Sequence, residues 1–330
     1  MVYSDSTLSK RFDRRSRKRL AWAAAGGLLL TLPLFVSDYR LFQIGLIAST
    51  SIITLGLVIV TGIAGQVSLA QAAFAALGAY GSTLLAQRLG IPQWIGIPIT
   101  AAVVGASGIV LGMLTLRVEG HNLALATMAL TAIVQVVIVH WEGLTGGALG
   151  LAVPPLKIGS MALTSGAALF YVIIPMTLTM LVLAANLLDS RIGRAFAALR
   201  QSEVAAMSAG VNIVHYKALA FSISAVFGAV GGGLQALQTT YLDPQAFSIL
   251  ESVLFIAIIV IGGFRSIAGA VLGSMVFIII PATLGVFQAY KGFAFAVLLL
   301  VAIVLFPGGL ASLGAAVLGA AGASISKLHK

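Results

Sequence analysis

Long apolar runs separated by short polar stretches make up most of this chain of 330 residues. An α-helix needs roughly 20 apolar residues to cross a bilayer, and ten segments approach that length. These segments are 20–37, 41–60, 66–87, 93–116, 121–140, 166–188, 218–240, 250–263, 267–288 and 292–306. The pattern predicts an all-α, polytopic integral membrane protein with about 10 transmembrane helices.

The apolar segments follow one another closely enough to leave no room for a soluble domain. We therefore expect a basic cytoplasmic tail over 1–19, one transmembrane domain over 20–322 and a short cytoplasmic tail over 323–330. Segment 250–263 is the shortest of the ten, and merging it with its neighbour would move every later segment to the opposite side. The number of spans is therefore left open at 8, 9 or 10.

Glycine is abundant, at 37 residues. Several glycines stand four residues apart, such as Gly228 with Gly232 and Gly269 with Gly273. Small residues at this spacing let transmembrane backbones approach closely. The pattern predicts tight packing between helices at these positions.

The polar stretch 189–217, DSRIGRAFAALRQSEVAAMSAGVNIVHYK, has a long apolar segment on each side. It carries four cations and two acids, and its middle is typical of a short helix. A loop this polar cannot lie in hydrocarbon, and its positive excess favours the cytoplasmic side. We predict a cytoplasmic helical loop that serves as a docking surface for a soluble partner.

The composition supports the membrane assignment and explains the net charge. The chain is 60% hydrophobic and 8% charged, whereas soluble domains carry about 25% charged residues. A net charge of +10 would suggest nucleic-acid binding in a soluble protein. Here seven of the 19 cations lie between Lys10 and Arg19, directly before an apolar segment, as the positive-inside rule requires. We expect no nucleic-acid partner.

The distribution of Lys and Arg also predicts the orientation. With a cytoplasmic N-terminus and ten crossings, 15 cations fall inside and 4 outside, which is the expected asymmetry. The tail resembles the start of a signal peptide, but the apolar segment after it does not lead into an A-x-A cleavage site. We therefore expect a retained first helix.

No catalytic or metal-binding pattern is recognisable. The chain has no cysteine, no HExxH and no G-x-x-x-x-G-K-[ST], so we predict no enzyme, no metal site and no ATP bound by this chain. The apolar segments lack carboxylates, except for Glu251 at the start of one of them. Ion-coupled transporters commonly use intramembrane carboxylates. Their scarcity favours an energy source outside the chain.

The stretch Thr61–Gln71 places glycines and amide side chains between two apolar segments. One interpretation is a broken helix that lines a transport path. The other is an ordinary cytoplasmic loop followed by a helix capped at Ser68. The residues do not decide between them.

Four blocks of sequence, in this order and spacing, resemble the permease subunits of branched-chain amino acid ABC importers, in the LivM-like half of the pair. The blocks are GLVIVTGIAGQVSLAQAAFAALGAY (56–80), LRVEGHNLALATMAL (116–130) with HWEGLTGGALGL (140–151), IGRAFAALRQSEVAAMSAGVNIVHYKALAF (192–221), and VIGGFRSIAGAVLGS (260–274) with LFPGGL (305–310). Ala70 and Gln71 stand where the family usually has Gly-His, a departure that bears on substrate preference. Val204 separates Glu203 from the alanines of the family's glutamate-alanine-alanine…glycine pattern.

The resemblance implies an importer permease fold with a cytoplasmic coupling helix at about 201–210, in the cell inner membrane. It implies a second, LivH-like permease subunit, two ATP-binding subunits that hold ATP and Mg, and an external solute-binding protein. By the same resemblance, Arg194, Arg200 and Glu203 offer charged contacts to the ATPase, and Ala205, Ala206 and Gly210 allow its close approach. The substrate path is predicted at four residues of the Thr61–Gln71 stretch. They are Gly65, Gln66, Ser68 and Gln71.

The resemblance leaves the substrate open. Permeases of urea or short-amide importers share the same blocks, so branched-chain amino acids compete with those solutes. A gradient-driven secondary transporter is the alternative hypothesis from another class, and a membrane scaffold without transport is a third hypothesis. The scaffold predicts no broken helix at 61–71.

Overall fold

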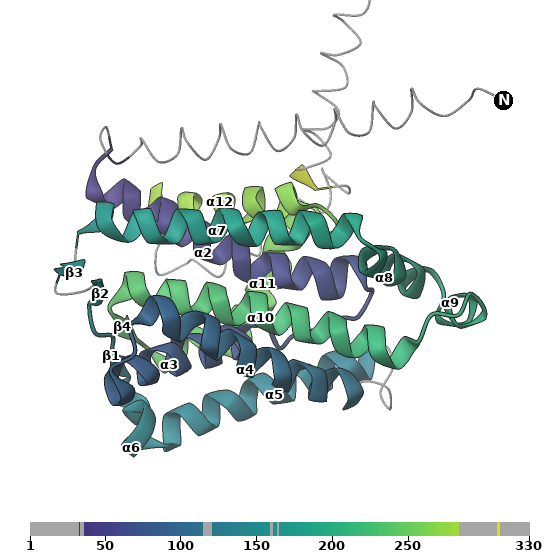
Figure 1. The fold of residues 1–330 in the computed structure, drawn as a ribbon, viewed down its shortest axis with the longest axis horizontal. Coiled ribbons are helices and arrows are strands. Elements are labelled where there is room, and N and C mark those ends of the chain that lie inside the picture. The colour runs from purple at the N-terminus through teal and green to yellow at the C-terminus, as the bar shows by residue number, and fades with distance from the viewer. Residues whose placement is uncertain are drawn as a thin grey trace, which may run out of the picture.

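The computed structural model describes residues 33, 36–114, 121–158, 161–163, 165–283 and 309–310. Among these residues, eight long helices form the body of the fold (Figure 1). They are α2 (Asp38–Leu57), α3 (Gln71–Leu89), α4 (Gln93–Leu114), α5 (His121–His140), α7 (Gly166–Asp189), α10 (Ile213–Thr239), α11 (Ile249–Gly262) and α12 (Ile267–Thr283). A π-helix, η2 (Val58–Ile63), continues α2.

The two ends of the bundle differ in their connections (Figure 1). The loop end, as we call it, carries α8 (Arg191–Gln201) and α9 (Glu203–Ser208), and α9 projects outward. The strand end carries α6 (Glu142–Thr145), η4 (Gly147–Leu149), η5 (Pro244–Phe247) and four short strands. The strands are β1 (Leu151–Ala152) paired antiparallel with β4 (Tyr241–Leu242), and β2 (Leu156–Ile158) paired antiparallel with β3 (Met161–Leu163). These strands are absent from the sequence prediction, which contains helices alone.

Within the described residues, five helices are long and apolar enough to cross a membrane. They are Asp38–Ile63, Gln93–Leu114, Asn122–His140, Gly166–Asp189 and Ile213–Thr239. At 1.5 Å per residue, even the 19-residue helix approaches the roughly 30 Å thickness of the hydrocarbon core. These helices confirm the prediction of a polytopic membrane protein.

Three predicted spans differ from the observed helices. Segments 250–263 and 267–288 were expected to cross separately, but α11 and α12 form a pair bent by 117°, which is one broken span or a re-entrant loop. Segment 66–87 becomes helical only at Gln71, and α3 is not among the five helices above. The described part therefore holds five candidate spans, or six with the bent pair.

Four predicted elements lie outside the described residues: the tails 1–19 and 323–330, nearly all of segment 20–37, and segment 292–306. The predicted total of ten therefore stays a prediction.

Helix α10 is the centre of the bundle and packs against α2, α3 and α4. It runs parallel to α3 and antiparallel to the other two, as the pairing of their glycines with α10 residues shows. A Cβ placed on Gly228 would lie 2.8 Å from the Cβ of Phe74, and one on Gly232 would fall against the backbone of Ala75. The predicted close packing at this glycine pair is confirmed, because only a residue without Cβ fits there.

The second predicted glycine pair is confirmed as well. A Cβ on Gly273 would meet the carbonyl oxygen of Ile258, and one on Gly269 would lie 2.8 Å from the carbonyl oxygen of Gly262. These contacts join α11 to α12 directly after the bend between them. Small residues here let the two helices fold back at close range.

Candidate functional site

The polar loop 189–217 forms two short helices in place of the single one predicted. Ser190 caps α8 by accepting hydrogen bonds from the backbone N–H groups of Ile192 and Gly193. Ser202 has an extended backbone, ends α8, and caps α9 by accepting from the N–H of Ala205. Serine is favoured at such positions because its hydroxyl satisfies amides that the helix leaves unpaired. The helix predicted at 201–210 is observed at Glu203–Ser208.

Helix α8 is fastened to the bundle by one apolar face. Its buried residues include Phe196 and Leu199, and the ring of Phe196 packs edge-to-face on Tyr216 of α10 at 6.2 Å between centroids. Arg194 and Arg200 lie on the exposed side. This arrangement gives α9 a fixed base.

Helix α9 exposes apolar side chains. Val204 is 70% exposed and Met207 57% exposed, and Ala205 is exposed beside them. Ala206 faces inward and is buried. Isolated exposed apolar residues are common, but two on one short, projecting helix present a contact surface.

Gly210 ends this helical region through its backbone conformation. Its φ is 81°, in the left-handed region that glycine adopts without strain. Its N–H donates to Met207, and the next amide, of Val211, donates to the carbonyl of Ala206. No atom lies within 4 Å of a Cβ added at Gly210, so glycine is needed for its φ rather than for space.

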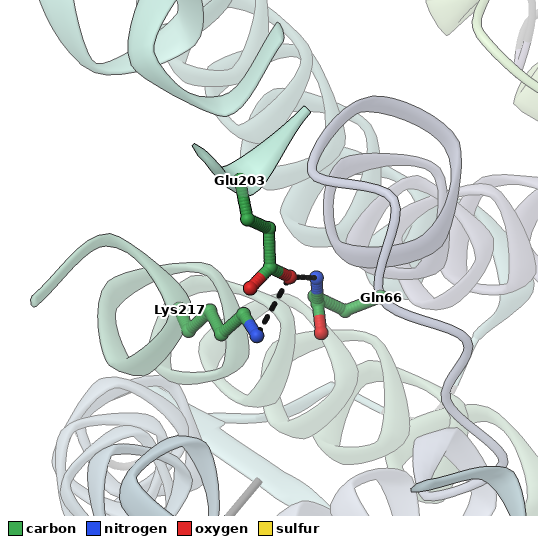
Figure 2. Close-up of polar contacts among 3 residues, drawn as sticks. All are labelled: Gln66, Glu203 and Lys217. Carbon is green, nitrogen blue, oxygen red and sulfur yellow. Dashed lines mark hydrogen bonds and ion pairs between the residues drawn. The ribbon is translucent and has the colours of Figure 1, made fainter. Parts of the chain in front are cut away.

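Glu203 points into the molecule and meets two side chains there (Figure 2). Its Oε1 lies 2.7 Å from Nζ of Lys217 on α10, and Nε2 of Gln66 donates to the same oxygen at 3.5 Å. The Lys217 side chain is only 4% exposed, against 35% for Glu203. Sequence reasoning assigned Glu203 to contact with a partner protein and missed Lys217. The available signal was a lysine just inside the long apolar helix that follows the loop.

The segment 64–70, which we call the break, separates η2 from α3. Several of its backbone groups form hydrogen bonds with hydroxyl side chains of other elements. The N–H of Leu69 donates to Oγ1 of Thr127 at 2.9 Å, and its carbonyl accepts from Oγ1 of Thr131 at 2.7 Å. Irregular backbone in a membrane protein is tolerated when protein groups replace the lost helical bonds.

Two further bonds of this kind hold the break and the start of α3 in place. The hydroxyl of Thr61 donates to the carbonyl of Gln66 at 3.0 Å. The N–H of Ala72, in the first turn of α3, donates to Oγ of Ser252 at 3.1 Å. The proposed cap at Ser68 is wrong, since α3 begins at Gln71 behind Ala70 without a side-chain cap. A helical interruption is present at 61–71, as the broken-helix interpretation requires.

The four residues predicted for a substrate path fall into two groups. Gly65 lies against the side chain of Arg200, because a Cβ added at Gly65 would be 2.9 Å from Cγ of Arg200. Gln66 contacts Glu203. Ser68 and Gln71 are almost fully buried.

Gln71 joins three helices. Its Nε2 donates to the carbonyl of Ile53 on α2 at 2.6 Å, and its Oε1 accepts from the hydroxyl of Ser224 on α10 at 2.9 Å. In this conformation, Gly65 and Gln66 therefore lie at the loop end, whereas Ser68 and Gln71 are enclosed within protein.

A second cation lies close to the break. The corner between α11 and α12 is in contact with Gly62, where an added Cβ would meet the carbonyl oxygen of Phe264. The next residue, Arg265, interacts electrostatically with Arg200, and burial together with this like charge lowers the pKa of the Arg200 guanidinium. Two cations thus flank residues 62–65. In the part of the chain that the structure describes, no three His, Asp or Glu side chains gather to hold a metal ion.

Comparisons with known proteins agree with this architecture. The profile of the family described as "Branched-chain amino acid transport system / permease component" matches residues 40–306. No solved structure matches the chain significantly.

Curated relatives carry the same description. The high-affinity branched-chain amino acid transport system permease protein LivM of Escherichia coli (strain K12) is 29% identical over 283 residues, which covers 78% of this chain and 67% of that protein. LivM of Salmonella typhimurium is 28% identical over the same length. The probable LivM of Methanocaldococcus jannaschii is 21% identical over 200 residues, covering 59% of this chain and 58% of that protein. The profile covers most of the chain, and the chain therefore belongs to the family of branched-chain amino acid transport permeases.

Proposed function

We propose that this permease is one of two membrane-spanning subunits of an ATP-binding cassette importer for branched-chain or related amino acids. Its partners in this proposal are a LivH-like second permease subunit, two ATP-binding subunits and an external solute-binding protein. The names of the relatives support the solute class, since they describe branched-chain amino acid transport systems. Urea or a short amide is the alternative solute.

The main observation that supports the proposal is the projecting helix α9. It stands outside the bundle on a well-packed base, α8, and turns Val204 and Met207 outward. A partner with an apolar groove would bury both side chains, and each buried apolar side chain contributes about 1.5–3 kcal/mol. The exposed cations Arg194 and Arg200 of α8 would suit acidic groups on such a partner.

In the proposed orientation the loop end faces the cytoplasm, and the N-terminus lies on the same side of the inner membrane. The charge of the loop supports this placement. Closure of the ATP-binding subunits moves α9, and the bundle alternates between inward-facing and outward-facing states. Solute delivered at the strand end crosses between the two permease subunits.

Co-purification tests the assembly. The tagged chain, extracted gently from its native membrane, is expected to bring an ATP-binding subunit and a second permease with it. The double substitution Val204→Glu with Met207→Glu should abolish recovery of the ATP-binding subunit, because two charges then enter an apolar contact. Leu149→Glu is the matched control, since Leu149 is 84% exposed at the strand end, and it should leave that recovery unchanged.

The result that would overturn the proposal is recovery of the chain alone, with gradient-driven transport in liposomes that needs no ATP. Equal recovery of the ATP-binding subunit with the double variant and with the control would exclude α9 as its docking site.

A further inference from the structure

Lys217 is a buried cation in α10 whose charge the sequence analysis left without a role. Its side chain is 4% exposed, and Glu203 forms the ion pair with it at 2.7 Å. Among the residues that the structure describes, no other acid pairs with it. An ammonium group taken out of water is costly unless an opposite charge stays beside it. Lys217 therefore requires Glu203 to remain in place.

The pair connects three separate parts of the loop end (Figure 2). Glu203 is the first residue of α9, Lys217 lies in the first turns of α10, and Gln66 belongs to the break. The backbone of Gln66 is itself held in position, because its backbone carbonyl accepts a hydrogen bond from the hydroxyl of Thr61 at 3.0 Å. One carboxylate oxygen thus links the docking helix to a central helix and to the interruption before α3.

This link constrains how α9 can move. If α9 swung away from the bundle alone, Lys217 would lose its counter-charge while still enclosed by protein. Movement of α9 together with the start of α10 and with the break keeps the pair intact and avoids that cost. Because α10 packs against α2, α3 and α4, such movement reaches the centre of the bundle.

We propose that the Glu203–Lys217 ion pair, braced by Gln66, pins α9 to α10 and to the break, so that displacement of α9 is passed on as a rigid movement. This inference rests on the proposed function and deepens it, because it makes Lys217 a positioning residue for coupling. It also gives Glu203 a role within the chain in place of the partner contact expected from sequence. The exposed surface of α9 is left for docking.

The test uses the complete transporter in proteoliposomes, with uptake of labelled leucine and ATP hydrolysis measured in the same vesicles. Lys217→Met removes the charge and keeps most of the apolar stem, so Glu203 can turn to water. We expect the ATP-binding subunit to co-purify as before, hydrolysis to continue, and uptake per ATP hydrolysed to fall about tenfold, within the usual range of coupling between sites.

The exchanged pair, Glu203→Lys with Lys217→Glu, should recover uptake per ATP to within about threefold of the unaltered transporter, since the opposite charges meet again. Arg191→Met removes an exposed cation from α8 and is the matched control. It should leave the uptake per ATP hydrolysed unchanged. A merely destabilised transporter would lose uptake and hydrolysis together, so the ratio separates a defect in coupling from a defect in folding.

The inference is overturned if Lys217→Met keeps the normal uptake per ATP, or if the exchanged pair is no better than Lys217→Met. Should the exchanged chain not assemble, the single variant decides. Failure of the unaltered chain to co-purify with an ATP-binding subunit would instead contradict the proposed function, so the two failures are distinguishable.

Discussion

The substitution Gly232→Ala tests whether α10 is held in the bundle by direct contact between backbones. A Cβ at position 232 would fall against the carbonyl oxygen of Ala75 and would lie 2.6 Å from its carbonyl carbon. Ordinary contacts of a Cβ begin at 3.4 Å, so α3 and α10 must move apart by at least 0.8 Å, the difference between these distances. The atoms in the way belong to the backbone and cannot rotate aside.

The cost follows from two opposing contributions. Overpacking of a well-packed core costs about 1–3 kcal/mol, and a backbone obstacle places this site at the upper end. The added methyl group improves helix propensity by about 1 kcal/mol relative to glycine. The net loss is about 2 kcal/mol, which is up to about 30-fold in the ratio of folded to unfolded protein.

Unfolding of the purified chain by sodium dodecyl sulfate in mixed micelles, followed by circular dichroism, measures this loss. Gly96→Ala is the matched control, because Gly96 is also helical and its nearest contact to an added Cβ is an ordinary 3.4 Å. The control should be neutral or slightly stabilised. Equal stability of Gly232→Ala and Gly96→Ala would refute the backbone contact.

Two other predictions concern the loop end. Thr127→Val should destabilise the chain by about 1–3 kcal/mol in the same titration, because the partly buried N–H of Leu69 loses its acceptor. A loss no larger than that of Ser107→Ala, whose hydroxyl bonds only within its own helix, would contradict this. Ser202→Ala removes the cap of α9 and should raise hydrogen exchange at the Ala205 amide about fivefold, from a loss of about 1 kcal/mol. Unchanged exchange there would show that the cap is dispensable.

The spanning helices could be predicted because hydrocarbon imposes a simple requirement on the residues that face it. Helix α4 illustrates this, since its apolar run marks the observed span closely. Helix α3 shows the limit of the pattern. It is enclosed by α2, α4 and α10, so it carries buried polar groups such as Gln71 and Thr83. An enclosed helix does not face hydrocarbon and can carry polar residues, so hydrophobicity marks its start at Gln71 poorly.

The candidate site was predicted in part. The polar loop and its helix were evident from charge between apolar segments. The glycines and amides of 61–71 marked that stretch, but they left a broken helix and an ordinary loop equally open. The connection between the loop and this stretch was not evident, because Gln66 and Glu203 lie 137 residues apart in the chain and no local pattern encodes their contact. The inward turn of Glu203 and the burial of Lys217 likewise depend on how α8 places α9 on α10. The small sheet formed by β1 and β4 escaped prediction for the same reason.

In the proposed function, this permease moves solute at the expense of ATP hydrolysed by partner subunits. Uptake of labelled leucine into proteoliposomes tests it most directly, comparing the complete set of two permeases, two ATP-binding subunits and binding protein with the purified chain alone. We expect uptake that requires ATP and every partner, with none by the chain alone under an ion gradient. Gradient-driven uptake by the chain alone, unaffected by ATP, would contradict it.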